Sequence, residues 1–323
     1  MDERADRSYD ERRLGMKVLI FGGAGYVGYE LAKRFIENGD SVVVYDSLCN
    51  GDPDARTKIT ALKGVILYEQ SISDVNAVKD AIRTAQPDLV YNLAAVHYIP
   101  YCIENPEVVF STNYQGLQNI ITALKNFPTT KFIFASSASV YGSPNAQCTL
   151  DTPTNPNDIY GASKLAGEYL IKHQLTNYVL MRLFNVYGEL DPHPHLIPKV
   201  ARAAVRNEVL NLGTATAERD FVYVKDVANA FFVARLGEVG ETYIIASGTT
   251  HSVKEVVDKI YELSGSTGEV QYETEGNVRS NDASYLSGDS SGLRRLGWQP
   301  TVTIEQGLLT AIAAAHRANH GGI

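Results

Sequence analysis

Residues 17–28 read KVLIFGGAGYVG, a short apolar run that leads into a glycine-rich turn. The run at 18–21 is typical of a strand buried on both faces, and helical periodicity over 26–37 follows it. Further apolar runs and helical stretches alternate as far as residue 185: strands are predicted at 42–45, 65–68, 89–93, 132–135 and 178–183, and helices at 75–85, 106–125 and 159–175. This alternation implies right-handed crossovers. The fold class is therefore α/β, a doubly wound parallel sheet of the Rossmann type over residues 16–185.

The alternation breaks after Asn185, where Pro192, Pro194 and Pro198 indicate a loop. Residues 186–323 are predicted to form a smaller, mixed α/β substrate lobe. The boundary is approximate, because the chain can interleave between the two parts.

Composition limits the function classes. The chain has 323 residues, of which 44% are hydrophobic, and a formal net charge of -8, which opposes non-specific binding of nucleic acid. Cys49, Cys102 and Cys148 are too far apart in sequence to form a metal-ligand pair, so no metal is expected. No run approaches the roughly 18 apolar residues of a membrane span. Residues 1–15 are rich in charge and lack an apolar core, so we interpret them as a flexible extension and expect a cytoplasmic protein.

The glycine triad indicates a cofactor. Gly22, Gly25 and Gly28 let the chain turn tightly, so that the backbone, including Tyr26 and Val27, can approach a diphosphate at the helix N-terminus. A plain strand–helix turn could carry the same glycines, and GxxGxxG departs from the commoner GxGxxG. The position of the triad, after the first strand and at the start of a helix, favours a dinucleotide.

Two acidic residues follow predicted strands. Asp46, eighteen residues after Gly28, can accept hydrogen bonds from the adenosine ribose and would repel a 2′-phosphate, which favours NAD over NADP. The alternative is a turn residue at the strand end. Asp74 lies where an acid could meet the adenine amino group, or where it would cap the next helix.

Tyr160 and Lys164 share one face of a predicted helix that follows the serine-rich stretch at 136–139. A neighbouring ammonium stabilises a phenolate, so the pKa of Tyr160 is predicted to lie well below about 10 and the phenol to act as a base near neutrality. A Tyr-x-x-x-Lys pair is frequent by chance on surface helices. Its place after a glycine-rich loop and a serine-rich strand end favours catalysis.

The chain resembles the extended short-chain dehydrogenase/reductase superfamily, in its nucleotide-sugar epimerase and dehydratase branch. The matching stretches are 22–28, 45–48 (YDSL), 92–95 (NLAA), 113–119, 136–142, 160–164, 182–188 (RLFNVYG), 219–226 and 296–298 (LGW). So many motifs in the family's order are very specific for the superfamily. They are less specific for the reaction.

The resemblance implies roles for the site residues. Tyr160 would be the acid/base, Lys164 would tune it and hold the nicotinamide ribose, and Ser137 would hydrogen-bond the reacting sugar hydroxyl. Ala94 and Asn113 would lie beside NAD. The alternatives are a strand-end turn serine for Ser137 and a structural residue for Asn113. The resemblance also implies a homodimer formed through the helices at 106–125 and 159–175.

The reaction is interpreted from a missing acid pair. Dehydratases of this branch carry Asp-Glu just after the catalytic hydroxyl residue, where this chain has Ala138 and Ser139. Dehydration is therefore disfavoured, and we expect NAD-dependent epimerisation of a nucleotide-activated hexose at C4 through a transient 4-keto sugar. A 4-ketoreductase or dehydratase of the same family, and a non-catalytic nucleotide sensor, stay open as alternatives.

The resemblance places the nucleotide sugar against Asn185, Arg219 and Arg279, because arginine suits phosphate. A surface ion pair is the alternative for each arginine. Residues 189–195 lack the arginine that uronate epimerases carry, so a neutral UDP-hexose is expected. His195 stands where glucose epimerases often have Asn. His97, Tyr98 and Cys102 are expected to face the sugar, with no role assigned.

Overall fold

The computed structural model describes residues 15–49, 52–144, 146–189, 191–272 and 283–320. The predicted extension at 1–15 lies outside these residues except for Gly15.

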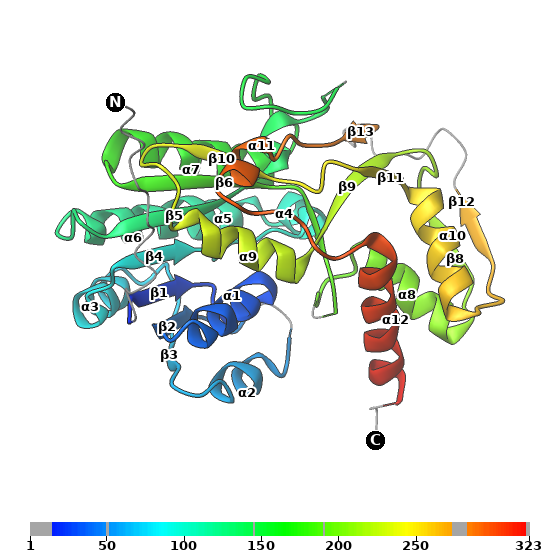
Figure 1. The fold of residues 1–323 in the computed structure, drawn as a ribbon, viewed down its shortest axis with the longest axis horizontal. Coiled ribbons are helices and arrows are strands. Elements are labelled where there is room, and N and C mark those ends of the chain that lie inside the picture. The colour runs from blue at the N-terminus through cyan, green and yellow to red at the C-terminus, as the bar shows by residue number, and fades with distance from the viewer. Residues whose placement is uncertain (1–14, 50–51, 145, 190, 273–282, 321–323) are drawn as a thin grey trace, which may run out of the picture.

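The larger part of the molecule is built on one parallel sheet of seven strands in the order β10-β6-β5-β4-β1-β2-β3 (Figure 1). The strands are β1 (Lys17–Phe21), β2 (Ser41–Asp46), β3 (Ile66–Glu69), β4 (Leu89–Asn92), β5 (Lys131–Ser137), β6 (Tyr178–Leu183) and β10 (Thr242–Ile245). Phe21 at the end of β1 is level with Tyr45 in β2 and Asn92 in β4, so the carboxyl ends of these strands meet at one edge. The predicted doubly wound fold is confirmed.

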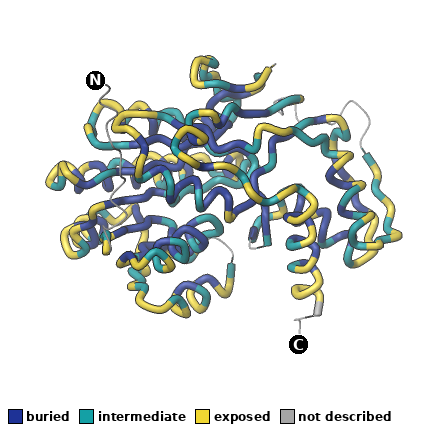
Figure 2. The backbone as a smooth tube through the Cα atoms, in the orientation of Figure 1, coloured by how far each residue is buried: buried dark blue, intermediate teal, exposed yellow. Residues whose placement is uncertain are grey.

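Helices cover both faces of this sheet. On one face α1 (Tyr26–Glu37) and α9 (Val224–Ala234) pack against each other and bury Leu31, Phe35 and Phe231. On the other, α3 (Val75–Ala85), α6 (Leu117–Leu124) and α7 (Ile159–Gln174) bury a second apolar cluster. Figure 2 shows the result: buried backbone along the strands and exposed backbone on the outer sides of the helices.

The helix predicted over 106–125 differs in detail. It consists of α5 (Pro106–Val109), the π-helical segment η1 (Phe110–Gly116) and α6. π-helical turns inside α-helices occur frequently at functional sites, and this one contains Asn113. Two short helices, α2 (Ala55–Thr60) and α4 (Ile99–Glu104), were not predicted.

The smaller lobe is mixed, as predicted. Its main sheet joins β7 (Asn185–Tyr187), β9 (Glu218–Tyr223), β11 (Thr250–Ser252) and β13 (Tyr285–Leu286), and β8 (Leu210–Leu212) pairs with β12 (Val270–Tyr272). Three helices, α8 (Leu196–Arg206), α10 (Val253–Ser264) and α12 (Ile304–His320), pack around one apolar cluster. Figure 1 shows this lobe beside the carboxyl ends of the large sheet.

The chain interleaves between the two parts. After β9 it returns to the large sheet, where α9 covers one face and β10 pairs with β6. Asp226 in α9 accepts hydrogen bonds from the backbone of Thr301 and Val302, and Trp298 donates to the Asp226 carbonyl. These bonds anchor the segment that leads into α12.

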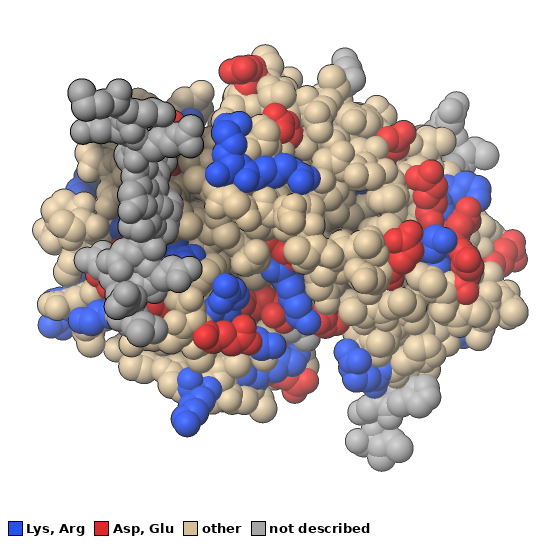
Figure 3. All heavy atoms as spheres, viewed as in Figure 1, with Lys and Arg blue, Asp and Glu red and all other residues tan. Residues whose placement is uncertain are grey.

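Two properties concern the helices and the surface charge of the described residues. None of their helices is both long and apolar enough to cross a membrane. On the face seen in Figure 3, Lys and Arg side chains are interspersed with Asp and Glu.

Candidate active site

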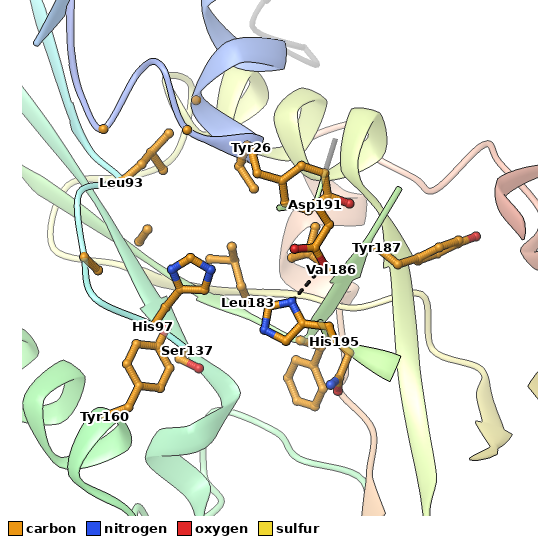
Figure 4. A pocket seen from close by; sticks show the side chains of 18 of the residues that line it. Tyr26, Leu93, His97, Ser137, Tyr160, Leu183, Val186, Tyr187, Asp191 and His195 are labelled. Carbon is orange, nitrogen blue, oxygen red and sulfur yellow. Dashed lines mark hydrogen bonds and ion pairs between the residues drawn. The ribbon is translucent and has the colours of Figure 1, made fainter. Parts of the chain in front are cut away.

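A cavity of about 320 Å³ opens at the carboxyl ends of the parallel strands. The glycine loop, the loop after β4, the end of β5 and the start of α7 form its wall on the side of the large sheet. The opposite wall comes from β7 and from residues 191–198 of the smaller lobe. Figure 4 shows side chains from both lobes pointing into this space. A crevice at this edge is where open α/β sheets bind their ligands.

The glycine loop is shaped for close approach. Gly22 has a positive φ of 77°, and a Cβ there would lie 2.5 Å from the Ala94 nitrogen; a Cβ at Gly28 would collide with the Gly22 carbonyl oxygen. The helix that follows, α1, has Gly25 as its N-cap and therefore no capping side chain. Its first N–H groups therefore face the loop uncapped, an arrangement that binds anions.

Asp46 braces this loop. Its carboxylate accepts hydrogen bonds from the Ala24 nitrogen at 3.0 Å and the Leu48 nitrogen at 2.8 Å. Burial raises the pKa of Asp46, and the backbone hydrogen bonds lower it. The Gly25 nitrogen also donates to this carboxylate. A carboxylate has about four acceptor positions, so about one remains for a ribose hydroxyl. The bracing was not predicted.

Asp74 is the N-cap of α3, one of the two alternatives that the sequence left open. It accepts from the backbone of Asn76 and Ala77 at 2.9 and 3.0 Å. A contact with adenine stays a prediction.

Tyr160, Lys164 and Ser137 all line the cavity. Asp158 caps α7 by accepting from the Gly161 nitrogen at 2.7 Å, which places Tyr160 in the first turn. The Lys164 ammonium is buried, donates to the Ala135 carbonyl at 2.8 Å and lies 5.7 Å from the centre of the Tyr160 ring.

The prediction of a low pKa for Tyr160 is wrong for the protein chain itself. Burial raises the pKa of this phenol, a hydrogen bond with Ser137 lowers it, and Cys102 and Asp158 raise it further. Burial also lowers the pKa of Lys164 to about 7, so at neutral pH the ammonium is only partly charged. In both groups the cost of burying a charge exceeds the expected mutual stabilisation.

A buried ion pair behind the site was not predicted. Glu168 in α7 accepts two hydrogen bonds from Arg182 in β6, at 2.9 and 2.7 Å, and one from the Ser136 hydroxyl at 2.6 Å. Arg182 also donates to the Tyr141 hydroxyl at 2.9 Å. These bonds join β5, β6 and α7 next to Ser137.

Asn113 holds the loop after β4. Its side chain accepts from the Val96 nitrogen at 2.8 Å and donates to the Val96 carbonyl at 2.9 Å and the Ser163 hydroxyl at 3.0 Å. The loop is thereby tied to α7 next to Lys164. A direct contact of Asn113 with NAD stays a prediction.

Only some of the residues predicted to bind the nucleotide sugar line the cavity. Asn185 and His195 line the cavity, and the Asn185 Oδ1 is buried without a hydrogen-bond partner among the described residues. Arg219 does not line it; it lies on the same face of β9 as Phe221, which does. Arg279 lies outside the described residues.

Histidines from the two lobes meet in the cavity wall. The His97 ring centre lies 4.8 Å from that of His193 and 5.9 Å from that of His195, and Tyr98 stacks on His193 at 5.4 Å. His193 was not singled out from the sequence. Of the residues expected to face the sugar, His97 lines the cavity, whereas Tyr98 and Cys102 do not.

No three His, Cys, Asp or Glu side chains in the described part of the chain are arranged to hold a metal ion.

Comparisons with known proteins point in one direction. Residues 18–246 match the model of the NAD dependent epimerase/dehydratase family. The low-salt glycan biosynthesis protein Agl12 of Haloferax volcanii is 31% identical, over 91% of this chain and 96% of that protein. The structure resembles UDP-glucose 4-epimerase of Thermus thermophilus in complex with NAD (TM-score 0.84, 27% identity) and that of Thermotoga maritima with UDP-glucose (TM-score 0.86, 26% identity). Each match covers 94% of this chain and 100% of the other.

Proposed function

Because the chain belongs to the NAD dependent epimerase/dehydratase family and is an NAD-dependent enzyme of it, we propose that it interconverts the C4 epimers of a UDP-hexose. The observation that carries the proposal is the meeting of Tyr160, Ser137 and Lys164 with the glycine loop in one cavity. A substrate hydroxyl beside Tyr160 would then also lie beside the nicotinamide end of the dinucleotide.

The residues present fit NAD. The uncapped first turn of α1 would bind the diphosphate, next to glycines at which any Cβ would collide with the backbone. Asp46 keeps acceptor capacity for the adenosine ribose. Lys164 would hold the nicotinamide ribose. When bound, NAD would supply hydride transfer from and back to C4, and the positive charge of its nicotinamide ring would counteract the effect of burial on the pKa of Tyr160.

The chain's own residues handle the proton. Tyr160 takes the proton of the sugar O4 hydroxyl as the C4 hydrogen leaves, and Ser137 positions that oxygen by a hydrogen bond. The resulting 4-keto sugar turns in the cavity and presents its other face. Tyr160 then returns the proton to O4, so the enzyme ends each cycle as it began.

Epimerisation is favoured over dehydration by the residues after Ser137. Dehydration of the 4-keto sugar needs proton carriers near C5 and C6. Where the dehydratases of this branch carry Asp-Glu, this chain has Ala138 and Ser139 at the start of the 3₁₀ helix η2 (Ala138–Tyr141). A methyl group has no exchangeable proton, and a serine hydroxyl is a far weaker acid than a carboxyl group.

Binding of UDP and sugar is assigned to the lobe at 186–323. Asn185 offers a buried oxygen without a partner among the described residues, and His195 lines the same cavity with its ring centre 5.9 Å from that of His97. Arg219 and Arg279 are proposed to bind phosphate. Residues 189–195 contain no arginine to pair with a sugar carboxylate, which supports a neutral hexose.

Incubation with UDP-galactose and catalytic NAD tests the proposal. UDP-glucose should accumulate to an equilibrium mixture without net formation of NADH. Failure to convert UDP-galactose, UDP-glucose or their N-acetyl forms would reject the reaction. Stoichiometric consumption of NAD(P)H with a 4-keto sugar would instead support the ketoreductase alternative.

A homodimer is proposed as well. Phe110, Tyr114 and Tyr169 on η1 and α7 are 50%, 37% and 56% exposed. These aromatic side chains lie on the two helical segments through which the resemblance predicts dimerisation, and pairing with a second copy would bury them.

A further inference from the structure

Two cavities meet at His97. The larger reaches Tyr160, and a smaller one of about 30 Å³ lies beside Asp46 at the end of β2. Among the described residues, His97, Gly25 and Tyr26 line both. His97 therefore stands at the junction of the two cavities, together with the first turn of α1.

A dinucleotide bound to this chain would span both cavities and cross the junction at His97. Its adenosine ribose belongs at Asp46 and its nicotinamide beside Tyr160, and the diphosphate links the two. The diphosphate is the part that the uncapped first turn of α1 attracts. His97 borders the same passage.

Side chains of the other lobe hold His97 in place. His193 and His195 pack against its ring at 4.8 and 5.9 Å, and the Nδ1 atom of His195 lies 2.8 Å from an Asp191 oxygen. Figure 4 shows the rings of His97 and His195 side by side in the cavity that Tyr160 and Ser137 also line.

We propose that His97, held by His193 and His195, forms a wall of the NAD diphosphate site next to the first turn of α1, and that it takes up a proton when the dinucleotide binds. The inference rests on NAD binding and not on the proposed epimerisation, so the two fail separately.

The charge balance around His97 supports proton uptake. Burial is the largest cause that lowers the pKa of His97; His193 and His195 also lower it, Asp191 and a backbone hydrogen bond to Ala95 raise it, and the net pKa is about 4. The ring is therefore neutral at pH 7. The other titratable groups that line the two cavities are Tyr26, Tyr29, Asp46, Asp52, Lys58, Tyr160, Lys164, Tyr187, Asp191, His193 and His195.

A diphosphate brings two negative charges to this neutral ring. Opposite charge nearby favours the protonated imidazole, so the pKa of His97 rises in the complex. Between about 4 and the raised pKa, the complex then binds more protons than the free protein, and the proposal requires this range to reach neutral pH. NAD affinity must consequently increase as the pH falls, by up to about tenfold per pH unit for one full proton.

Calorimetry of the full-length chain, freed of bound dinucleotide, tests the inference. NAD is titrated at pH 7 in phosphate and in Tris, whose ionisation enthalpies differ, so that the difference in heat gives the protons taken up. ADP-ribose, which keeps the diphosphate, should show the same uptake, and adenosine should show none. The Kd for NAD, measured from pH 8 to pH 6, should fall several-fold.

The His97→Gln variant should lose the proton uptake and the pH dependence of the Kd. The matched control, His173→Gln, changes an exposed histidine on α7 and should behave as wild type. His97→Asn, with a smaller side chain, provides the same test if the Gln variant does not fold. Absence of uptake in the wild type, or equal uptake in a folded His97 variant, would overturn the inference.

Discussion

Burial shifts the pKa values of Tyr160 and Lys164 in opposite directions, and both shifts favour the uncharged forms. Charge at these residues therefore depends on what binds next to them. Without a bound cofactor, Tyr160 would therefore stay a neutral phenol and would not be a reactive phenolate.

Tyr160→Phe should lower kcat by a factor of about 10²–10⁴, because the only group lost is the hydroxyl that moves the proton. NAD content, measured by absorbance after denaturation, should equal that of wild type. Tyr169→Phe, on the exposed side of the same helix, is the control. Near-normal turnover by the Tyr160 variant would show that another group is the base.

Lys164→Met should change the pH dependence of stability. A lysine titrates near 10.4 in an unfolded chain and at about 7 here. Between these values the unfolded chain binds more protons at this residue, so its contribution to the free energy of unfolding rises with pH, by up to about 1.4 kcal/mol per unit. Urea denaturation at pH 7 and pH 9 should show the wild type gaining stability relative to the variant. An unchanged difference would contradict the low pKa.

At the scale of elements, the turn between β1 and α1 depends on the absence of side chains. Gly28→Ala places a methyl group against the Gly22 carbonyl oxygen, which shifts the loop and its N–H groups. We expect NAD affinity, measured by calorimetry, to fall at least tenfold while the fold persists. Gly213→Ala puts the same methyl group into open space and should change nothing. If both variants bound NAD equally well, the glycine loop would not be the cradle.

The ion pair between Glu168 and Arg182 should be the costliest polar contact to break at the sheet. Glu168→Leu leaves a buried guanidinium without its carboxylate, so the free energy of unfolding should fall by about 3–5 kcal/mol. Lys254→Met, which removes an exposed ion pair with Asp258, should change the free energy of unfolding far less, because solvent screens this pair. Urea denaturation compares the two.

Regular periodicity made the first six strands and most helices of the large sheet predictable. The short helices α2 and α4 span only six residues each, too few for a periodic pattern. The π-helical segment carries ordinary helical periodicity, so nothing in its sequence separates it from an α-helix.

At the scale of the whole molecule, contacts between distant segments limited what the sequence could predict. Tyr160 and Lys164 share a helix and could be paired by spacing, whereas His97 and His193 are brought together only when the two lobes pack. The Tyr160 pKa was mispredicted for the same reason, because burial depends on the packing around α7.

The proposed dimer makes a further prediction. Tyr169→Lys with Phe110→Lys places two charges on the exposed aromatic surface of α7 and η1. Light scattering after size exclusion should show the wild type with twice the mass of the chain and the double variant with the mass of one. Leu309→Lys, a change at an exposed apolar residue of α12, is the control. If the wild type had the mass of one chain, the proposal of a homodimer would be wrong.

The late position of β10 bears on how the protein is made. A nascent chain leaving the ribosome completes β6 well before residues 242–245 exist, and α9 is also still missing. Until then β6 presents an open strand edge, and open edges promote pairing between chains. A fragment cut at residue 185 keeps this edge open and lacks the cover of α9, so it should aggregate more readily than the full chain.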